Sequence, residues 1–203
     1  MAQTQVASKG RRRSSERVAA ELLEAALVEF STHGFEGAST RAIARRAGWH
    51  QPQINYHFQS KEQLWRASVD LLFAELADET GALDGGSADP VAMFLSGLER
   101  FVRFSSRRPE LHRIIGLESA TSSGRLEWIV QHHTSPLFAQ ITRSWTLVRE
   151  AGAGRDLSPQ AVWQLLVGLG ARPFATAPEA ELLVGTPLSA EAQVKLLVEL
   201  LAL

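Results

Sequence analysis

Two glycines, Gly34 and Gly48, divide the N-terminal part of this chain into short segments with helical periodicity. In residues 15–33 the apolar side chains recur every three to four positions, which is the spacing of one helix face. Gly34 suits the positive φ that commonly ends a helix. A second helix is predicted over residues 40–47 with Ser39 as its N-cap, and Gly48 then opens a sharp turn.

A third short helix is predicted over residues 51–57, where Pro52 stands near the first position, the place at which a helix tolerates proline best. Ala44 is small enough for the second and third helices to approach closely. Ile54 and Phe58 lie four residues apart and anchor the third helix to the core. Three short helices with this turn predict a helix-turn-helix, whose last helix can enter the major groove of DNA.

The remainder of the chain carries helix signals of the same kind, and no segment alternates between apolar and polar residues as a strand would. The helix over residues 125–150 either kinks or restarts at Pro136. The fold class is predicted to be all-α, with about nine helices. Further helices are predicted to start at Ser60, Asp89-Pro90, Pro109, Arg125, Ser158-Pro159 and Ser189.

Three parts are predicted along the chain. Residues 1–13 are polar and end in a basic run, which predicts a disordered basic arm. Residues 14–62 are predicted to form the helix-turn-helix domain, here called the head. Residues 63–203 are predicted to form a larger helical domain, here called the body. The segment 81–88 is rich in Gly, Asp and Ser, and it is predicted to be a loop that separates the helices of the head from those of the body.

Charge is distributed unevenly, although the whole chain has a formal net charge of −1. Residues 1–61 contain nine Lys or Arg and five acidic residues, whereas the rest contains twelve and seventeen. A basic head suggests a polyanionic partner, but an uneven solvated surface gives the same counts. The chain has no cysteine, which excludes disulfides and thiolate chemistry. Without a signal peptide or an apolar run of about 18 residues, we expect a cytoplasmic protein.

Five blocks of the head follow one another in a fixed order and spacing: LEAALVEF (23–30), GF (34–35), STRAIARRAG (39–48), INYHF (54–58) and SKEQL (60–64). Together they resemble the DNA-binding domain of the TetR family of transcriptional regulators, over about residues 16–65. Trp49, His50 and Asn55 depart from the residues common in that family, which leaves the operator sequence open. The resemblance implies a bacterial homodimer that represses from a palindromic operator and is released by a small-molecule inducer.

The same resemblance implies DNA contacts residue by residue. Gln51, Pro52 and Gln53 would lie in the major groove, since glutamine pairs with the adenine edge and proline packs on a thymine methyl. Lys61, beside the free N–H groups at a helix start, would be one of the phosphate contacts. The alternative for each residue is a polar side chain that faces solvent. The full predicted set is Thr40, Arg41, Arg45, His50, Gln51, Pro52, Gln53, Asn55, Tyr56, His57 and Lys61.

The resemblance also implies that the body, residues 63–203, binds an effector and forms the dimer. Ligand pockets between helices are mostly apolar with a few polar groups. Ordinary core packing is the simpler interpretation of any single candidate. The candidate pocket residues are Trp128, His132, Trp145, Trp163, Arg172 and Phe174.

The last two predicted helices, over residues 158–177 and 189–203, are expected to form the dimer interface. The final helix is apolar on most sides, and a seam through Leu197 and Leu201 is predicted. Gly170 is small enough for close helix contact. Burial inside one subunit is the alternative interpretation.

No motif indicates an enzyme. The stretch from Gly168 to Gly170 lacks the third glycine and the preceding strand of a dinucleotide fingerprint. His132 and His133 are adjacent on a helix and point to different faces, which makes a poor metal site. We therefore expect no catalytic residue, cofactor or metal. A DNA-binding protein controlled by a protein partner is an alternative, and ligand-dependent loss of operator binding would separate the two.

Overall fold

The computed structural model describes residues 2–81 and 89–203, and within these ranges it contains helices and loops but no strand. This confirms the predicted all-α class. If each π turn is counted with the helices that it joins, the described ranges form ten helices, against about nine predicted. Apart from Gly81, the segment predicted as the loop between head and body lies outside the described residues. The chain divides into two compact units, Met1–Leu71 and Leu72–Leu203.

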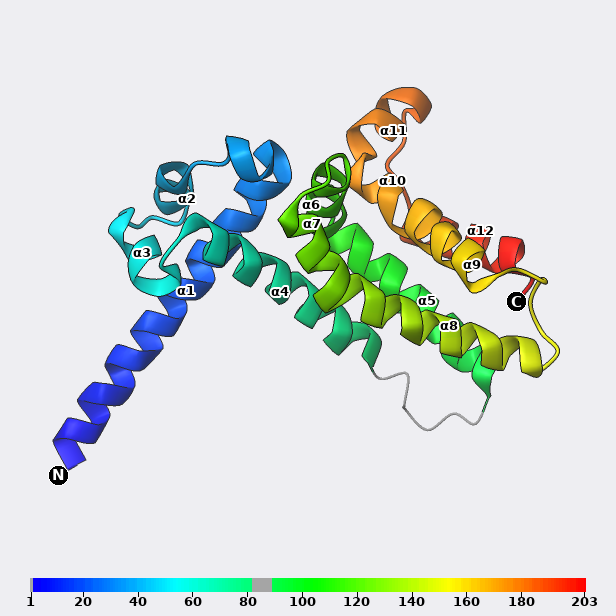
Figure 1. The fold of residues 1–203 in the computed structure, drawn as a ribbon, viewed down its shortest axis with the longest axis horizontal. Helices are drawn as coiled ribbons and strands as arrows, with labels where there is room; N and C mark the ends of the chain where they lie inside the picture. The colour runs from blue at the N-terminus through cyan, green and yellow to red at the C-terminus, as the bar shows by residue number, and fades with distance from the viewer. Residues whose placement is uncertain (1, 82–88) are drawn as a thin grey trace. The chain divides into compact units, whose positions relative to one another are not determined.

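The N-terminal unit is a three-helix arrangement completed by the start of a fourth helix. Ile43 and Ala44 of the second helix and Ile54 of the third are buried against the first helix. Trp65 of the fourth helix is fully buried and stands edge-on to the Phe35 ring, with centroids 6.3 Å apart. The predicted helix-turn-helix packing is therefore confirmed. The elements are α1 (Ala2–Gly37), α2 (Thr40–Arg46), α3 (Pro52–Phe58) and the first part of α4 (Lys61–Thr80) (Figure 1).

Helix α1 differs from the prediction at its start and agrees with it near its end. It begins at Ala2, whereas residues 1–13 were predicted to be a disordered arm. The segment contains no proline, and its only glycine is Gly10, so a helix can continue from residue 15 toward the N-terminus. Gly34 has a φ of 67° and breaks the helical geometry where the helix was predicted to end. One further turn follows as far as Gly37.

The boundary between the two units lies inside α4, after Leu71, and not at residue 62 as predicted. Helix α4 runs without a break from Lys61 to Thr80. Its first half supplies Leu64 and Trp65 to the core of the N-terminal unit, so the helix belongs to both units.

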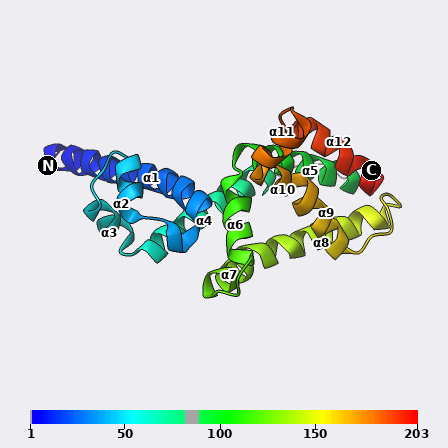
Figure 2. The same cartoon turned by 90° about the horizontal axis from the view of Figure 1, so that it is seen from above.

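The C-terminal unit is built around α5. This helix packs against α8, α12 and the π turn η3, and Figure 2 shows α12 beside it. Phe94, Leu98 and Val102 are its buried residues in the shared core. Trp145 of α8 is buried in the same core. The elements are α5 (Pro90–Arg107), α6 (Glu110–Ser119), α7 (Gly124–Ile129), η2 (Val130–Thr134), α8 (Ser135–Glu150), α9 (Pro159–Leu165), η3 (Leu166–Ala171), α10 (Arg172–Ala175), α11 (Ala177–Val184) and α12 (Ala190–Leu201).

Two π turns lie directly before prolines. The N–H of Ser135 donates to the carbonyl of Val130, five residues back, and Pro136 follows. The N–H of Arg172 donates to the carbonyl of Val167 in the same way, and Pro173 follows. Because proline has no N–H and its ring crowds the preceding turn, the wider turn lets the helix continue past it. Of the two alternatives at Pro136, the structure therefore shows a π-helical kink without a break.

The dimer seam predicted on the last helix is wrong in its choice of leucines. Leu197 and Leu201 are fully buried inside the C-terminal unit, where they pack in the core with α5. A Cβ at Gly170 would lie 3.3 Å from Leu197 and 3.2 Å from Phe101, so this glycine allows close packing within the subunit. Leu196 and Leu200 are the leucines of α12 that remain exposed, at 39% and 36%.

Candidate nucleic-acid interface and internal cavity

Helix α3 presents its polar side to the outside because its apolar side is held in the core. Gly48 has a φ of 75°, which turns the chain sharply between α2 and α3. Ile54 is buried, whereas Pro52 and Asn55 are exposed and Tyr56 is 76% exposed. A large aromatic side chain that projects so far from a packed helix has no role in the core of the unit.

The start of α2 is fixed by two hydrogen bonds. The Ser39 hydroxyl accepts from the N–H of Ala42 at 3.4 Å, which confirms the predicted N-cap. The carboxylate of Glu29 in α1 is buried and accepts from the N–H of Ser39 at 3.2 Å. The Gln51 amide donates to the Thr40 hydroxyl at 3.1 Å, which joins the start of α2 to the residue before α3. These hydrogen bonds therefore fix the positions of α2 and α3 relative to each other.

The turn between α2 and α3 is also tied to α1. Trp49 is half-buried, and its indole N–H donates to the Glu21 carboxylate at 2.8 Å. Arg17 donates to the other carboxylate oxygen at 2.8 Å. The Arg17 hydrogen bond first, and the Trp49 hydrogen bond second, hold the pKa of Glu21 below its ordinary value. Trp49 is thus a packed residue of the turn.

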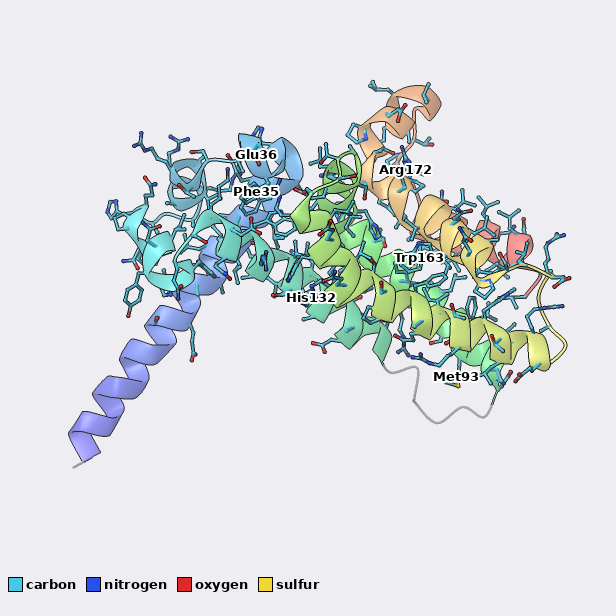
Figure 3. All side chains as sticks on the ribbon, viewed as in Figure 1. Phe35, Glu36, Met93, His132, Trp163 and Arg172 are labelled. Atoms are coloured by element: carbon cyan, nitrogen blue, oxygen red, sulfur yellow. The ribbon has the colours of Figure 1, made fainter. Side chains whose placement is uncertain are left out.

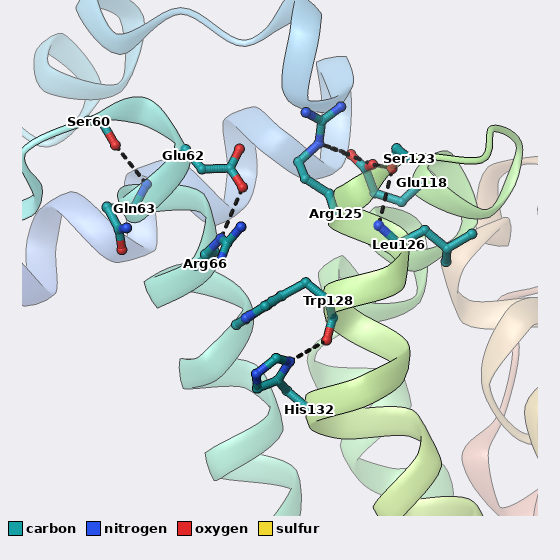
Figure 4. A network of polar contacts seen from close by, with 10 residues as sticks. All are labelled: Ser60, Glu62, Gln63, Arg66, Glu118, Ser123, Arg125, Leu126, Trp128 and His132. Carbon is teal, nitrogen blue, oxygen red and sulfur yellow. Dashed lines mark hydrogen bonds and ion pairs between the residues drawn. The ribbon is translucent and has the colours of Figure 1, made fainter.

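Lys61 lies at the start of α4, close to the end of α1. Its ammonium group donates to the Glu36 carbonyl at 3.4 Å and sits 4.7 Å from the centre of the Phe35 ring. Phe35 and Glu36 are labelled in Figure 3. The Ser60 hydroxyl accepts from the N–H of Gln63 at 3.1 Å, as the predicted cap requires (Figure 4). A phosphate contact by Lys61 would compete with its contact to the Glu36 carbonyl.

The structure brings all eleven predicted DNA-contact residues onto neighbouring elements of the N-terminal unit. They lie on α2, on the turn, on α3 and at the start of α4. The exposed members are Arg41, Arg45, His50, Gln51, Pro52, Asn55 and Tyr56. The half-exposed members are Thr40, Gln53, His57 and Lys61.

The C-terminal unit contains a cavity of about 350 Å³, formed between the end of α4, α5, α8, α9 and η3. Most of its lining is apolar, including Phe94, Phe101 and Trp163. The polar side chains in the lining are Thr80, Gln140 and Ser144. The volume lies in the range typical of small-molecule sites, about 300–1,000 Å³.

Only one of the six predicted pocket residues, Trp163, lines this cavity. Trp128 and His132 stack on each other at 5.2 Å, with the ring of His132 also 2.9 Å from the Trp128 carbonyl (Figure 4). Trp145 is buried in the core, and its indole donates to the Leu157 carbonyl at 2.9 Å. Arg172, which is labelled in Figure 3, is exposed, and Phe174 is buried. Helical periodicity places aromatic residues inside but cannot separate the cavity wall from the core.

Sequence reasoning missed the polar lining residues of α8. Gln140 and Ser144 stand four residues apart, which places them on one face of the helix. That face also carries Leu137 and Ile141, which line the cavity as well. Two uncharged polar residues inside an apolar helix face are the signal that could have found them.

Residues 2–81 and 89–203 contain neither a candidate metal cluster nor a membrane-spanning helix. No group of three or more histidine, aspartate or glutamate side chains is placed to hold a metal ion there. No helix in those ranges combines the length and the apolar character needed to cross a bilayer.

Known proteins resemble the chain at two levels. The family model of "Bacterial regulatory proteins, tetR family" matches residues 22–67, and no curated protein matches the chain. The solved structure of AibR in complex with isovaleryl coenzyme A and operator DNA has a TM-score of 0.74 at 17% identity, covering 92% of this chain and 98% of the other. A TetR/AcrR-family transcriptional regulator from Thermobifida fusca YX-ER1 has a TM-score of 0.63 at 22% identity, covering 91% and 96%.

At these identities the solved structures show a shared fold over nearly the whole chain, and the family match covers the helix-turn-helix itself. Both findings agree with the exposed α3 and with the packed three-helix unit. Residues 22–67 of this protein therefore match the DNA-binding domain of the TetR family of bacterial regulatory proteins, and the chain shares its overall fold with solved TetR/AcrR-family regulators.

Proposed function

We propose that this protein is a ligand-responsive transcriptional repressor that binds a palindromic operator as a homodimer and is released by a small-molecule inducer. The observation that carries the proposal is the polar surface of α3, held in position by buried and half-buried contacts on its other side. Gln51, Gln53 and Asn55 offer amides that can both donate to and accept from a base edge. Arg41 and Arg45, on α2, supply charge for the phosphates.

The cavity of the C-terminal unit supports the ligand response. It lies between helices and is lined by apolar side chains with three polar ones, which is the usual composition of a small-molecule site. AibR, which shares the fold, has a solved structure with both a ligand and operator DNA. A ligand that favours one arrangement of the protein shifts the operator affinity by its differential binding, typically about 5- to 150-fold.

The homodimer is proposed from the exposed leucines of α12. Leu196 and Leu200 lie one turn apart on one face of this helix, about 100° around the helix axis from the buried Leu197 and Leu201. A second copy that covers them would give a dimer with two recognition helices, one for each half-site. Half-sites about 34–36 Å apart, or a multiple of that distance, would then form a palindrome.

Selection from a random-sequence duplex library with the purified protein tests the proposal. We expect enrichment of a palindromic sequence, with binding confirmed by fluorescence anisotropy at several salt concentrations. The double variant Asn55→Ala/Tyr56→Ala is the matched control, because both side chains are exposed and their loss leaves the core and the Gln51–Thr40 hydrogen bond intact. The proposal fails if no sequence is enriched, or if the control variant enriches the same sequence equally well.

A further inference from the structure

None of the described residues that line the cavity of the C-terminal unit is charged. The side chains that the structure places around it come from α4, α5, α8, α9 and η3, and no Asp, Glu, Lys, Arg or His belongs to the described lining. The apolar walls include Leu76, Leu98, Ile141 and Leu166. An ion that enters such a cavity loses its hydration without gaining a counter-charge, which makes its binding unfavourable.

The polar groups of the lining differ in what they can still bind. The Thr80 hydroxyl already donates to the Leu76 carbonyl at 2.7 Å, so it offers a ligand only its lone pairs. Neither Gln140 nor Ser144 forms a side-chain hydrogen bond within the described part of the chain. Both are half-buried, one helical turn apart, and both line the cavity. A half-buried amide and hydroxyl without protein partners gain most from a polar atom of a ligand.

We propose that the effector is an uncharged, predominantly apolar small molecule whose one polar end hydrogen-bonds to Gln140 and Ser144. The proposal rests on the proposed function, since it names the ligand class of the same regulator. A hydroxyl, carbonyl or primary amide matches both groups, because the glutamine amide and the serine hydroxyl can each donate and accept.

The same chemistry excludes the ligand class seen with AibR. An acyl-coenzyme A carries several phosphate charges, and such charges need cationic side chains or helix N-terminal N–H groups nearby. The lining supplies no cation in the described residues. The volume of about 350 Å³ is also at the small end of the range for ligand sites, about 300–1,000 Å³.

Calorimetric titration of the full-length protein, without DNA, tests the ligand class with a matched series that shares one alkyl chain. The probes are 1-octanol, octanamide, octanoate and octylamine. We expect the alcohol and the amide to bind at one site per chain, and the two ions to bind at least about 100-fold more weakly.

Variants of α8 locate the polar end. Gln140→Leu and Ser144→Ala should each weaken octanol and octanamide by about 2- to 10-fold, since each removes one hydrogen bond. Ser144→Phe should abolish binding by filling the cavity. Thr146→Ala is the control, because Thr146 is exposed on the same helix and does not line the cavity. Circular dichroism and thermal unfolding verify that each variant folds.

The outcomes separate the ligand class from the regulatory function. Octanoate or octylamine binding as tightly as octanol would overturn the inference, as would the absence of binding by all four compounds. Gln140→Leu and Ser144→Ala variants that bind octanol as tightly as the wild type would also overturn it. Operator affinity is then measured by anisotropy with the bound probe present. Cavity binding with the expected selectivity but unchanged operator affinity would count against the ligand-responsive function and leave the ligand class standing.

Discussion

The indole N–H of Trp49 donates to the carboxylate of Glu21 at 2.8 Å and so joins the turn of the helix-turn-helix to the first helix, 28 residues away in the chain. Glu21 is held in place from its other side by Arg17. The turn precedes α3 directly, so we expect this contact to set the direction in which Gln51, just before α3, and Gln53 of α3 are presented.

Removing the indole N–H of Trp49 should weaken the positioning of α3, while an aromatic ring at residue 49 still packs in the turn. Trp49→Phe keeps a ring in the turn but loses the N–H, and we expect several-fold weaker operator binding with almost unchanged helix content. Glu21→Gln, which keeps a carbonyl acceptor, should retain more of the affinity. Anisotropy titrations and circular dichroism check both variants. Equal operator affinity of Trp49→Phe and the wild type would show that the contact does not position α3.

Base reading and phosphate anchoring should separate in two variants of the N-terminal unit. Gln53→Ala should cost about 1–3 kcal/mol on the selected operator and relax the preference at one base pair in each half-site. Lys61→Met keeps an unbranched apolar side chain and removes the ammonium group that lies over the Phe35 ring. It should weaken all duplexes alike and lower the salt slope by about one unit per subunit. Titrations against the operator and a scrambled duplex at several salt concentrations check this. If the base preference of Gln53→Ala is unchanged, Gln53 does not contact a base in the major groove.

The leucines of α12 should divide into a folding pair and an association pair. Leu197 is fully buried, so Leu197→Ala should lower the free energy of unfolding by about 2–5 kcal/mol. Leu196→Glu/Leu200→Glu places two charges on the exposed face and should give a folded monomer. Urea titrations and analytical ultracentrifugation measure the two effects. A wild-type protein that sediments as a monomer at micromolar concentration would contradict the proposed homodimer.

Stability should depend on pH through His112. Its ring stands edge-on to Phe101, with Nε2 3.4 Å from the Ser105 hydroxyl, and burial lowers the pKa of His112 from 6.5 to about 4. Between these two values the unfolded chain binds a proton at His112 and the folded chain does not. The free energy of unfolding should therefore fall as the pH falls, by about 1.4 kcal/mol per pH unit from this group.

The matched variant for this prediction is His112→Gln, which keeps a hydrogen-bonding side chain but cannot titrate. Urea unfolding of both proteins between pH 4.5 and 7 gives the difference in slope, which cancels the contribution of all other groups. Parallel curves for the two proteins would mean that His112 takes up its proton equally in the folded and unfolded states.

Helix starts could be predicted from the sequence because capping is local. Ser39, Asp89, Ser158 and Ser189 each accept a hydrogen bond from a backbone N–H two or three residues on, as predicted. The same applies to the turn at Gly48, whose positive φ is a property of that residue alone. These signals, with the order of the blocks in residues 23–64, were enough for the fold class and for the DNA-contact surface as a hypothesis.

Only the tertiary structure decided which partner each apolar face meets. The sequence alone made Trp145 and Trp163 equal candidates for the pocket, but Trp145 is in the core and Trp163 is at the cavity. The sequence likewise did not show that Leu197 is buried and Leu196 exposed, or whether the helix kinks or breaks at Pro136. Helical periodicity fixes which side chains share a face, and that is a property of neighbouring residues. What covers the face depends on helices distant in the chain, because the buried area is contributed by both partners and no local pattern specifies it.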